Sequence, residues 1–233
     1  MNDITIIYLT TNELPEKWVE FHRECLIEAL DGSPLIIMGC KTPNWKEWKD
    51  MGLALYIPQD KPKSPSNVYW QLLRGAKLAT TKYIAVAEDD TLYSKEHFNF
   101  RPKRHRIAYN MNHWSLFTWG EPVYNWRNRK GNYSMLGERE FVIECLEERF
   151  AKYPDGTPDR ITGEIGRDMV EHNLGITVRN AEEFSTTISI INFNHDVVAM
   201  DETQRNHRKR MGMLRAMDIP HWGKSEELVK HFI

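Results

Sequence analysis

Three acidic residues, Glu88, Asp89 and Asp90, follow one another directly after the apolar run 83–87 (YIAVA). Like charges held this close repel each other, so the triplet needs a cation or solvent to compensate it. Carboxylate oxygens are preferred ligands of hard divalent ions such as Mn²⁺ and Mg²⁺. In a reaction with a diphosphate leaving group, such an ion bridges both phosphates and neutralises the developing charge. The alternative interpretation is a solvated acidic turn.

Three groups later in the chain add to this chemistry. His195 follows an apolar run and can supply a neutral nitrogen ligand to Mn²⁺, unless it is an ordinary surface or core histidine. Glu164 and Asp168 lie four residues apart in a helix predicted over 162–174, so they would share one face. The alternative interpretation is an ordinary charged surface face. The basic cluster 205–210, with Arg208 and Lys209, could close over a nucleotide diphosphate or form a solvated helix face.

The elements that must position these residues alternate along the first 90 positions. Residues 4–9, 35–38, 53–57 and 83–87 are predicted strands, and helices are predicted from Pro15 and from a cap at Ser66. This order is typical of an α/β domain with a mostly parallel sheet. Ligands of such sheets bind beyond the carboxyl ends of the strands, which would bring residues 10–13 and the triplet together.

The second half is less regular, but no linker divides the chain. Strands are predicted over 106–109, 116–119 and 188–193, and helices over 138–152 and 162–174, the latter ended by Gly175. We therefore expect one domain over residues 1–233.

Composition tells more about the environment in which the protein works than about the reaction it catalyses. The net charge of −2 gives no overall attraction to nucleic acid, and three isolated cysteines argue against a disulfide framework. No segment has the roughly 18 apolar residues of a membrane span, and the start of the chain lacks the pattern of a signal peptide. These features predict a soluble, cytoplasmic protein.

The stretch Asn67-Val68-Tyr69, Leu73-Arg74-Gly75-Ala76-Lys77 and residues 83–90 resembles the GT-A glycosyltransferases, especially the family 2 group. The resemblance covers positions 4–98, with Glu88 standing where the family's acidic DxD-type motif prefers Asp. It implies a GT-A-like (Rossmann-like) fold with residues 1–100 binding the nucleotide sugar and 101–233 binding the acceptor. The implied cofactor is Mn²⁺ or Mg²⁺, held by Asp90 with Glu88 and His195.

The same resemblance implies further roles by position. Glu88 and Asp89 would lie near the ribose or a metal-bound water, and the base would lie near Thr10, Asn12 and Glu13, with Arg74 as a weaker candidate. Inverting members carry an acidic base on a helix, which favours Asp168 and places Glu164 second. The implied reaction is transfer of a hexose from a nucleotide diphosphate sugar, with a UDP-sugar favoured, to a hydroxyl.

The acceptor is suggested by aromatic residues mixed with positive charges. Trp114, Trp119 and Tyr133, together with Trp126, occur among seven basic residues of the stretch 101–130. Aromatic rings stack on sugars or exposed bases, and basic residues can follow a phosphate backbone, although the tryptophans could equally be core residues. The candidates are a saccharide or a hydroxymethylated pyrimidine in DNA, as in viral DNA-glucosylating enzymes; such a base must be flipped out of its duplex.

Two other functions remain open. One is a catalytically silent nucleic-acid-binding protein that keeps this fold. The other is a sugar-phosphate nucleotidyltransferase, which is less favoured because residues 10–13 (TTNE) do not form a glycine-rich, basic phosphate loop.

Overall fold

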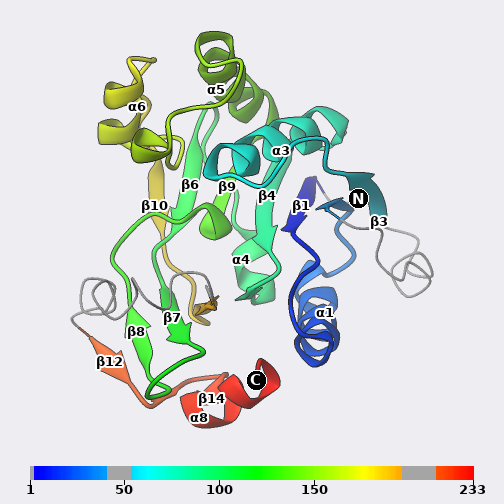
Figure 1. Ribbon diagram of the computed structural model, residues 1–233, viewed down its shortest axis with the longest axis vertical. Coiled ribbons are helices and arrows are strands. Elements are labelled where there is room, and N and C mark those ends of the chain that lie inside the picture. Colours follow the sequence, from blue (N-terminus) through cyan, green and yellow to red (C-terminus); the bar gives the residue numbers. More distant parts are fainter. Residues whose placement is uncertain (1–2, 41–53, 196–213) are drawn as a thin grey trace.

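The computed structural model describes residues 3–40, 54–195 and 214–233, and its centre is a seven-stranded sheet (Figure 1). The strand order is β10-β6-β9-β4-β1-β2-β3. The strands of this sheet are β1 (Ile4–Thr10), β2 (Leu35–Gly39), β3 (Ala54–Pro58), β4 (Tyr83–Glu88), β6 (Ile107–Asn110), β9 (Met135–Glu138) and β10 (Glu182–Phe184).

The sheet is mostly parallel, as predicted. β1 pairs in parallel with β2 and β4, β2 with β3, and β6 with β10. β9 alone among these described strands runs the other way, between β4 and β6. We did not predict β9 from the sequence, because its four residues MLGE have no periodic pattern.

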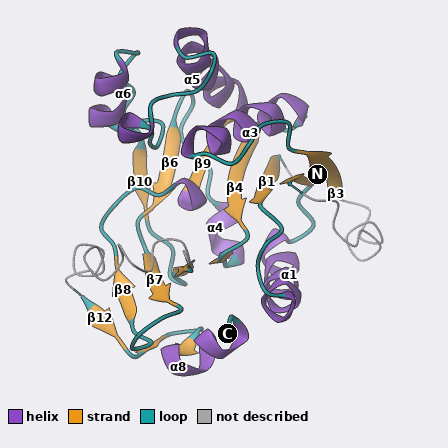
Figure 2. Cartoon of the chain, in the orientation of Figure 1, coloured by secondary structure: helices purple, strands orange, loops and turns teal. Residues whose placement is uncertain are grey.

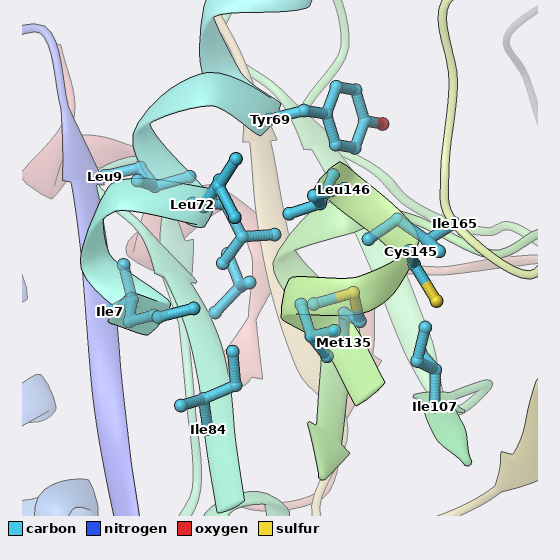
Figure 3. Close-up of a cluster of buried hydrophobic side chains, with 14 of the residues drawn as sticks. Ile7, Leu9, Tyr69, Leu72, Ile84, Ile107, Met135, Cys145, Leu146 and Ile165 are labelled. Atoms are coloured by element: carbon cyan, nitrogen blue, oxygen red, sulfur yellow. The ribbon is translucent and has the colours of Figure 1, made fainter. Parts of the chain in front are cut away.

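Helices cover both faces of this sheet (Figure 2). The helices are α1 (Glu16–Leu30), α3 (Pro65–Leu78), α4 (Lys95–Asn99), α5 (Arg139–Lys152), α6 (Asp168–Leu174) and α8 (Ser225–Leu228), with 3₁₀ turns at Asn132–Ser134, Asp159–Ile161 and Val229–His231. Side chains of β1 alternate between the faces: Ile7 packs with α3 and α5, whereas Ile6 packs with α1 and α4. Figure 3 shows the first of these cores, in which Leu72 of α3 and Leu146 of α5 meet over the sheet.

A second sheet, which we did not predict, extends the carboxyl edge of the first. Its order is β12-β8-β7-β11-β5, formed by β5 (Thr91–Leu92), β7 (His113–Phe117), β8 (Tyr124–Trp126), β11 (Ile190–Asn194) and β12 (Arg215–Ala216). A hairpin of β13 (Asp218–Ile219) and β14 (Gly223–Lys224) leads into α8. The C-terminal turns pack on Trp18 of α1, which is fully buried. This contact joins the end of the chain to its beginning.

Two helix predictions need correction. The N-cap of α3 is Ser64, whose hydroxyl accepts from the Asn67 amide at 3.0 Å, and Ser66 instead accepts from the Thr157 amide. Pro65 occupies the first turn, where its missing N–H is not needed. The helix predicted over 162–174 begins only at Asp168, after a 3₁₀ turn and an irregular loop, and Gly175 ends it with a φ of 61°.

Two general expectations can be compared with the described residues. No helix among them is long and apolar enough to cross a membrane. Cys25, Cys40 and Cys145 all carry free thiols. The sequence likewise argued against a disulfide framework.

Candidate functional site

A cavity of about 240 Å³ opens at the carboxyl ends of β1 and β4. Its walls come from the end of β1, the start of α3 with the loop before it, the acidic triplet, and His195 beyond β11. The lining residues are Leu9, Thr10, Thr11, Gln59, Lys63, Ser64, Asn67, Val68, Gln71, Glu88, Asp89, Asp90 and His195. The predicted convergence of the first and fourth strand ends is therefore present.

Asp89 is tied to the loop after β1. Its Oδ2 accepts hydrogen bonds from the Thr10 hydroxyl at 2.5 Å and the Thr11 amide at 3.2 Å. Its backbone carbonyl accepts from the indole of Trp18 at 2.7 Å. Burial, and next the charge of Asp90, raise the pKa of Asp89 to about 6. This carboxylate therefore joins two strand ends and has little capacity left for a ligand.

Asp90 and His195 face each other across the cavity. The distance from Asp90 Oδ2 to His195 Nε2 is 3.5 Å, and both side chains keep partial exposure. β5 and β11 pair antiparallel, and the Phe193 amide donates to the Asp90 carbonyl at 2.8 Å, which carries His195 to this place. Asn192 donates to the other carboxylate oxygen, Oδ1, at 3.1 Å. One oxygen of Asp90 is thus oriented by neighbours while the other faces the histidine.

Glu88 points to the second half of the molecule. Its Oε1 accepts from Asn132 at 2.8 Å, and its backbone amide donates to the Tyr93 hydroxyl at 2.9 Å. Burial, and next the charge of Asp90, raise the pKa of Glu88 well above its usual range. Glu88 is therefore a partly buried acid that lines the cavity and is bound to the second half of the chain.

The triplet does not form a ready-made cage for an ion among the described residues, and the ligand set of Asp90, Glu88 and His195 stays a prediction. Its three carboxylates diverge to three different sets of neighbours, and among the residues that the structure describes no three His, Cys, Asp or Glu side chains gather to hold a metal. Asp90 and His195 are placed so that they could act as two ligands of one ion. Ligand atoms of Mg²⁺ lie about 2.1 Å from the ion, so atoms 3.5 Å apart can share one, with the other positions left to water and phosphates.

A chain of amide side chains forms the wall opposite the triplet. Gln59 donates to the backbone carbonyls of Thr10 and Met38, both at 3.0 Å, and accepts from Asn67 at 2.9 Å. Asn67 in turn accepts from Gln71 at 2.7 Å. Because each amide is held by the next, this wall is rigid and presents polar groups at fixed places.

Three residues predicted for the nucleotide pocket do not line this cavity. Asn12 sits in a left-handed conformation with φ of 57°, just beyond Thr10. Glu13 forms an ion pair with Lys63, which does line the cavity. The Arg74 guanidinium is held on the outside by Asp60, Gln71 and the Pro58 carbonyl. Arg208 and Lys209 lie outside the described residues.

The two candidate bases differ in their surroundings. Glu164 is not on a helix, so the predicted shared face with Asp168 does not exist. The Glu164 side chain is 17% exposed and accepts from Arg167 at 3.1 Å, and its charge contributes to the raised pKa of Glu88. Asp168 is exposed at the start of α6. Glu164 is therefore the acid that lies near the triplet.

The aromatic residues predicted to bind the acceptor divide into buried and partly exposed ones. Tyr133 is only 5% exposed, and its hydroxyl bonds His113 Nδ1 at 3.0 Å, so its ring has no free face for stacking. Trp114 is half-buried against the core of the second sheet. Trp119 is also half-buried and packs edge-on against Phe117.

The basic residues of the stretch 101–130 do not form one track. Those before β6, including Arg101 with its ion pair to Asp3, lie at the amino edge of the sheet, opposite the cavity. Those after β8 lie at the other end, where the Arg129 carbonyl contacts His113 at 2.6 Å. The density of charge in the sequence therefore does not indicate a continuous phosphate-binding surface.

Sequence reasoning missed several residues of this site. Gln59, Asn67 and Asn192 are polar residues on or beside apolar elements, and that conflict was a usable signal. Asn132, which donates to Glu88, lies 44 positions away from it at the start of a short 3₁₀ turn that no pattern in the sequence predicted.

Comparison with known proteins gives similarity in fold and no more. No model of a protein family matches the chain, and no curated protein sequence matches it. Among solved structures, it is similar to residues 1–349 of TarS from S. aureus in complex with UDP, with 8% identity and a TM-score of 0.47 over 83% of this chain and 61% of that one. It is similar also to the mannosyltransferase PcManGT from Pyrobaculum calidifontis in complex with GDP-Man and Mn²⁺, with 10% identity and a TM-score of 0.46 over 88% of this chain and 60% of that one.

A third similar structure is a Desulfovibrio desulfuricans G20 protein whose nucleotide-diphospho-sugar transferase activity is inferred, with 10% identity and a TM-score of 0.42 over 91% of this chain and 92% of that one. The chain thus spans about 60% of the length of the TarS and PcManGT chains. Similarity at this level leaves the reaction and the substrates of this chain open.

Proposed function

We propose that this protein is a metal-dependent glycosyltransferase that moves a hexose from a nucleotide diphosphate sugar, UDP-sugar by preference, to an acceptor hydroxyl. The observation that carries the proposal is the Asp90–His195 pair at the mouth of a polar cavity beyond the carboxyl ends of parallel strands. A cavity with two partly exposed metal-type ligands and a rigid polar wall suits a ligand that brings its own phosphate oxygens.

The donor would lie along the cavity, bound by the half of the chain before residue 100. The amide wall of Gln59, Asn67 and Gln71 would shape the pocket for the base and ribose; its N–H groups are engaged within the protein, so it would offer only carbonyl oxygens as acceptors. Lys63, which lines the same cavity, offers a positive charge to a phosphate. Thr10 is already engaged with Asp89, so it shapes the pocket through that bond.

Asp90 and His195 would hold the Mn²⁺ or Mg²⁺ ion. The chemistry supplied by such an ion would be positive charge that stabilises the departing nucleotide diphosphate. The chain's own contribution is to aim the ligands: Asn192 fixes one oxygen of Asp90 and leaves Oδ2 turned to the histidine.

Glu164 is the proposed general base, in preference to Asp168. It is a partly exposed carboxylate on the triplet's side of the fold, and it belongs to the half of the chain after residue 101 that would bind the acceptor. A base that takes the hydroxyl proton on the face opposite the leaving group gives inversion at the anomeric carbon.

A saccharide hydroxyl is the acceptor that we propose, ahead of a hydroxymethylated base in DNA. A DNA acceptor needs a continuous basic surface, whereas the described basic residues of the stretch 101–130 lie at two opposite ends of the sheet. The partly exposed Trp119 supports a sugar-stacking role.

The test is release of nucleotide diphosphate from UDP-glucose and related UDP- and GDP-sugars with Mn²⁺, with oligosaccharides or hydroxymethylated DNA as acceptors. We expect turnover that needs Mn²⁺, stops with EDTA, and is lost in Asp90→Ala. Asp31→Asn is a suitable control, because Asp31 is a surface residue at the end of α1 whose positive φ of 47° also suits asparagine.

Absence of turnover with every donor, combined with salt-sensitive DNA binding that survives Asp90→Ala, would instead identify a nucleic-acid-binding protein. Release of pyrophosphate from a nucleoside triphosphate and a sugar phosphate would identify a nucleotidyltransferase.

A further inference from the structure

The loop that carries Glu164 is irregular, but buried side chains bind its backbone at three residues, one before Glu164 and two after it. Arg149 Nη1 donates to the Gly163 carbonyl at 2.9 Å. The Tyr109 hydroxyl donates to the Ile165 carbonyl at 2.7 Å, and the Glu171 carboxylate accepts from the Gly166 amide at 2.7 Å. These three anchors come from α5, β6 and α6, so three separate elements converge on one short segment.

The three anchors are buried to an unusual degree for polar residues. Arg149 is 1% exposed, and Tyr109 and Glu171 are fully buried. Glu171 also accepts from the Arg179 amide at 2.5 Å, so both of its oxygens bond backbone N–H groups. Hydrogen bonds between a buried charge and backbone groups are strong, so they restrict the loop far more than exposed contacts would.

Among the three anchors, Arg149 is the one whose burial is hardest to explain by stability. Its guanidinium lies over the ring of Tyr69 at 4.6 Å, yet its Nε and Nη2 have no hydrogen-bond partner among the residues that the structure describes. A buried cation whose donors are left unused lowers stability, and an apolar residue of the same size would often be better tolerated. A reason other than stability is therefore needed for an arginine at this position.

That reason lies in what surrounds the arginine. Burial raises the pKa of Tyr69 most, the charges of Glu164 and Glu88 raise it further, and the Arg149 charge opposes them. Figure 3 shows Tyr69 and Ile165 in the same part of the core, on the side of the sheet covered by α3 and α5. Arg149 thus lies beside the one ring that both carboxylates affect, and it bonds the residue directly before Glu164.

We propose that Arg149, supported by Tyr109 and Glu171, is a positioning residue that fixes the backbone of residues 163–166 and so aims the Glu164 carboxylate at the acceptor. This inference rests on the proposed function only in the identity of Glu164 as the base. The physical claim, that the anchors hold the loop in place, stands apart from any activity.

The first test is Arg149→Met, which keeps the length of the side chain and removes its donors and charge. We expect kcat to fall about 10- to 100-fold because the base is displaced, while the donor KM is unchanged. We expect the melting temperature to stay the same or rise. Arg149→Lys, which restores one donor, should recover part of kcat.

Lys152→Met is the matched control. Lys152 also lies on α5 and donates to a backbone carbonyl, that of Gly175 at 2.8 Å, but it is exposed and its bond is beyond α6. Its kcat should equal that of the unmodified protein. Tyr109→Phe is a milder second variant, since it removes one hydroxyl and leaves the ring in the core.

Amide hydrogen exchange gives the readout that needs no turnover. Exchange of residues 163–167 should be faster in Arg149→Met and in Tyr109→Phe than in Lys152→Met, with α5 unchanged. If the unmodified protein turns over no donor, the proposed function fails, while the exchange result still decides whether the anchors hold the loop. Unchanged exchange in both anchor variants, or faster exchange with an unaltered kcat in an active enzyme, overturns the proposal.

Discussion

The donor side and the acceptor side of the proposed site are built in different ways. On the donor side, Asp89, Thr10 and the amides of Gln59 and Asn67 are joined by short hydrogen bonds into one network. On the acceptor side, Glu164 projects from an irregular loop whose backbone is bound by distant, buried side chains. The polar groups of the donor side hold one another in place. The loop of the acceptor side is held in place by Arg149, Tyr109 and Glu171.

This difference concerns what each side has to do. A donor with a common nucleotide needs fixed hydrogen-bond partners, and a network of side chains at strand ends provides them. A base must be placed within hydrogen-bond reach of one hydroxyl, so its position matters more than its number of contacts. We therefore expect substitutions on the donor side to change binding and those on the acceptor side to change the rate.

The largest effect should come from Asp90, which joins the two sides. Asp90→Asn keeps the shape and the bond from Asn192 but removes the charge that faces His195. We expect kcat/KM to fall by about 10³-fold or more and Mn²⁺-dependent binding of UDP to disappear. Turnover assays and calorimetry measure both. Normal Mn²⁺-dependent binding in this variant would show that the ion, if any, binds elsewhere.

Glu164→Gln should affect the rate alone. Loss of a general base lowers kcat by about 10²- to 10⁴-fold, and the donor KM should remain as it was, since Glu164 does not line the cavity. Asp168→Asn, four residues further on and exposed, should behave as the unmodified enzyme. The anomeric configuration of the product, read by NMR, should be inverted. A larger effect of Asp168→Asn would reverse the assignment of the base.

Asn67→Ala should affect binding. Asn67 is 6% exposed and joins Gln59 to Gln71, so its removal leaves both amides without a partner. We expect about a tenfold rise in the donor KM and about 1–3 kcal/mol less stability, with kcat at saturating donor little changed. Asn99→Ala, on the exposed end of α4, is the control. A fall in kcat without a rise in KM would contradict the division between the two sides.

The smallest effect concerns two buried histidines behind the acceptor side. Burial lowers the pKa of His97 to about 3 and that of His113 to about 4. The unfolded chain therefore binds more protons below pH 6.5, so stability is full above that value and falls as the pH drops towards these pKa values. Each histidine should cost about 2 kcal/mol by pH 5. His97→Gln should remove its share of this loss, as measured by denaturant unfolding at pH 5 and 7.5.

The sequence predicted the strand ends that meet at the cavity, because those strands have a clear local pattern, but it did not predict Gln59 and Asn67. Residues 83–87 are apolar and the triplet comes next, so parallel pairing with β1 alone brings Asp89 to Thr10. The α3 helix and its core face were also predicted from the sequence, but its cap at Ser64 was not.

The acceptor side depends on contacts between distant positions, which a local pattern does not contain. β9 enters the sheet between β4 and β6 without any periodic signal. The apparent helix over 162–174 is broken because Gly163 and Gly166 lie in a loop; Gly166 has a φ of 71° and its amide bonds Glu171. Arg149 looked like one more charge on an amphipathic helix, and only tertiary packing shows that it is buried.

The pairing of β5 with β11 has a consequence for how the protein matures. Asp90 is made early, whereas His195 reaches it only after another hundred residues have been synthesised and β11 has paired beside β5. The proposed ion site would therefore be absent from any nascent or truncated chain that ends before β11. A divalent ion bound there would selectively stabilise chains in which β11 has paired with β5.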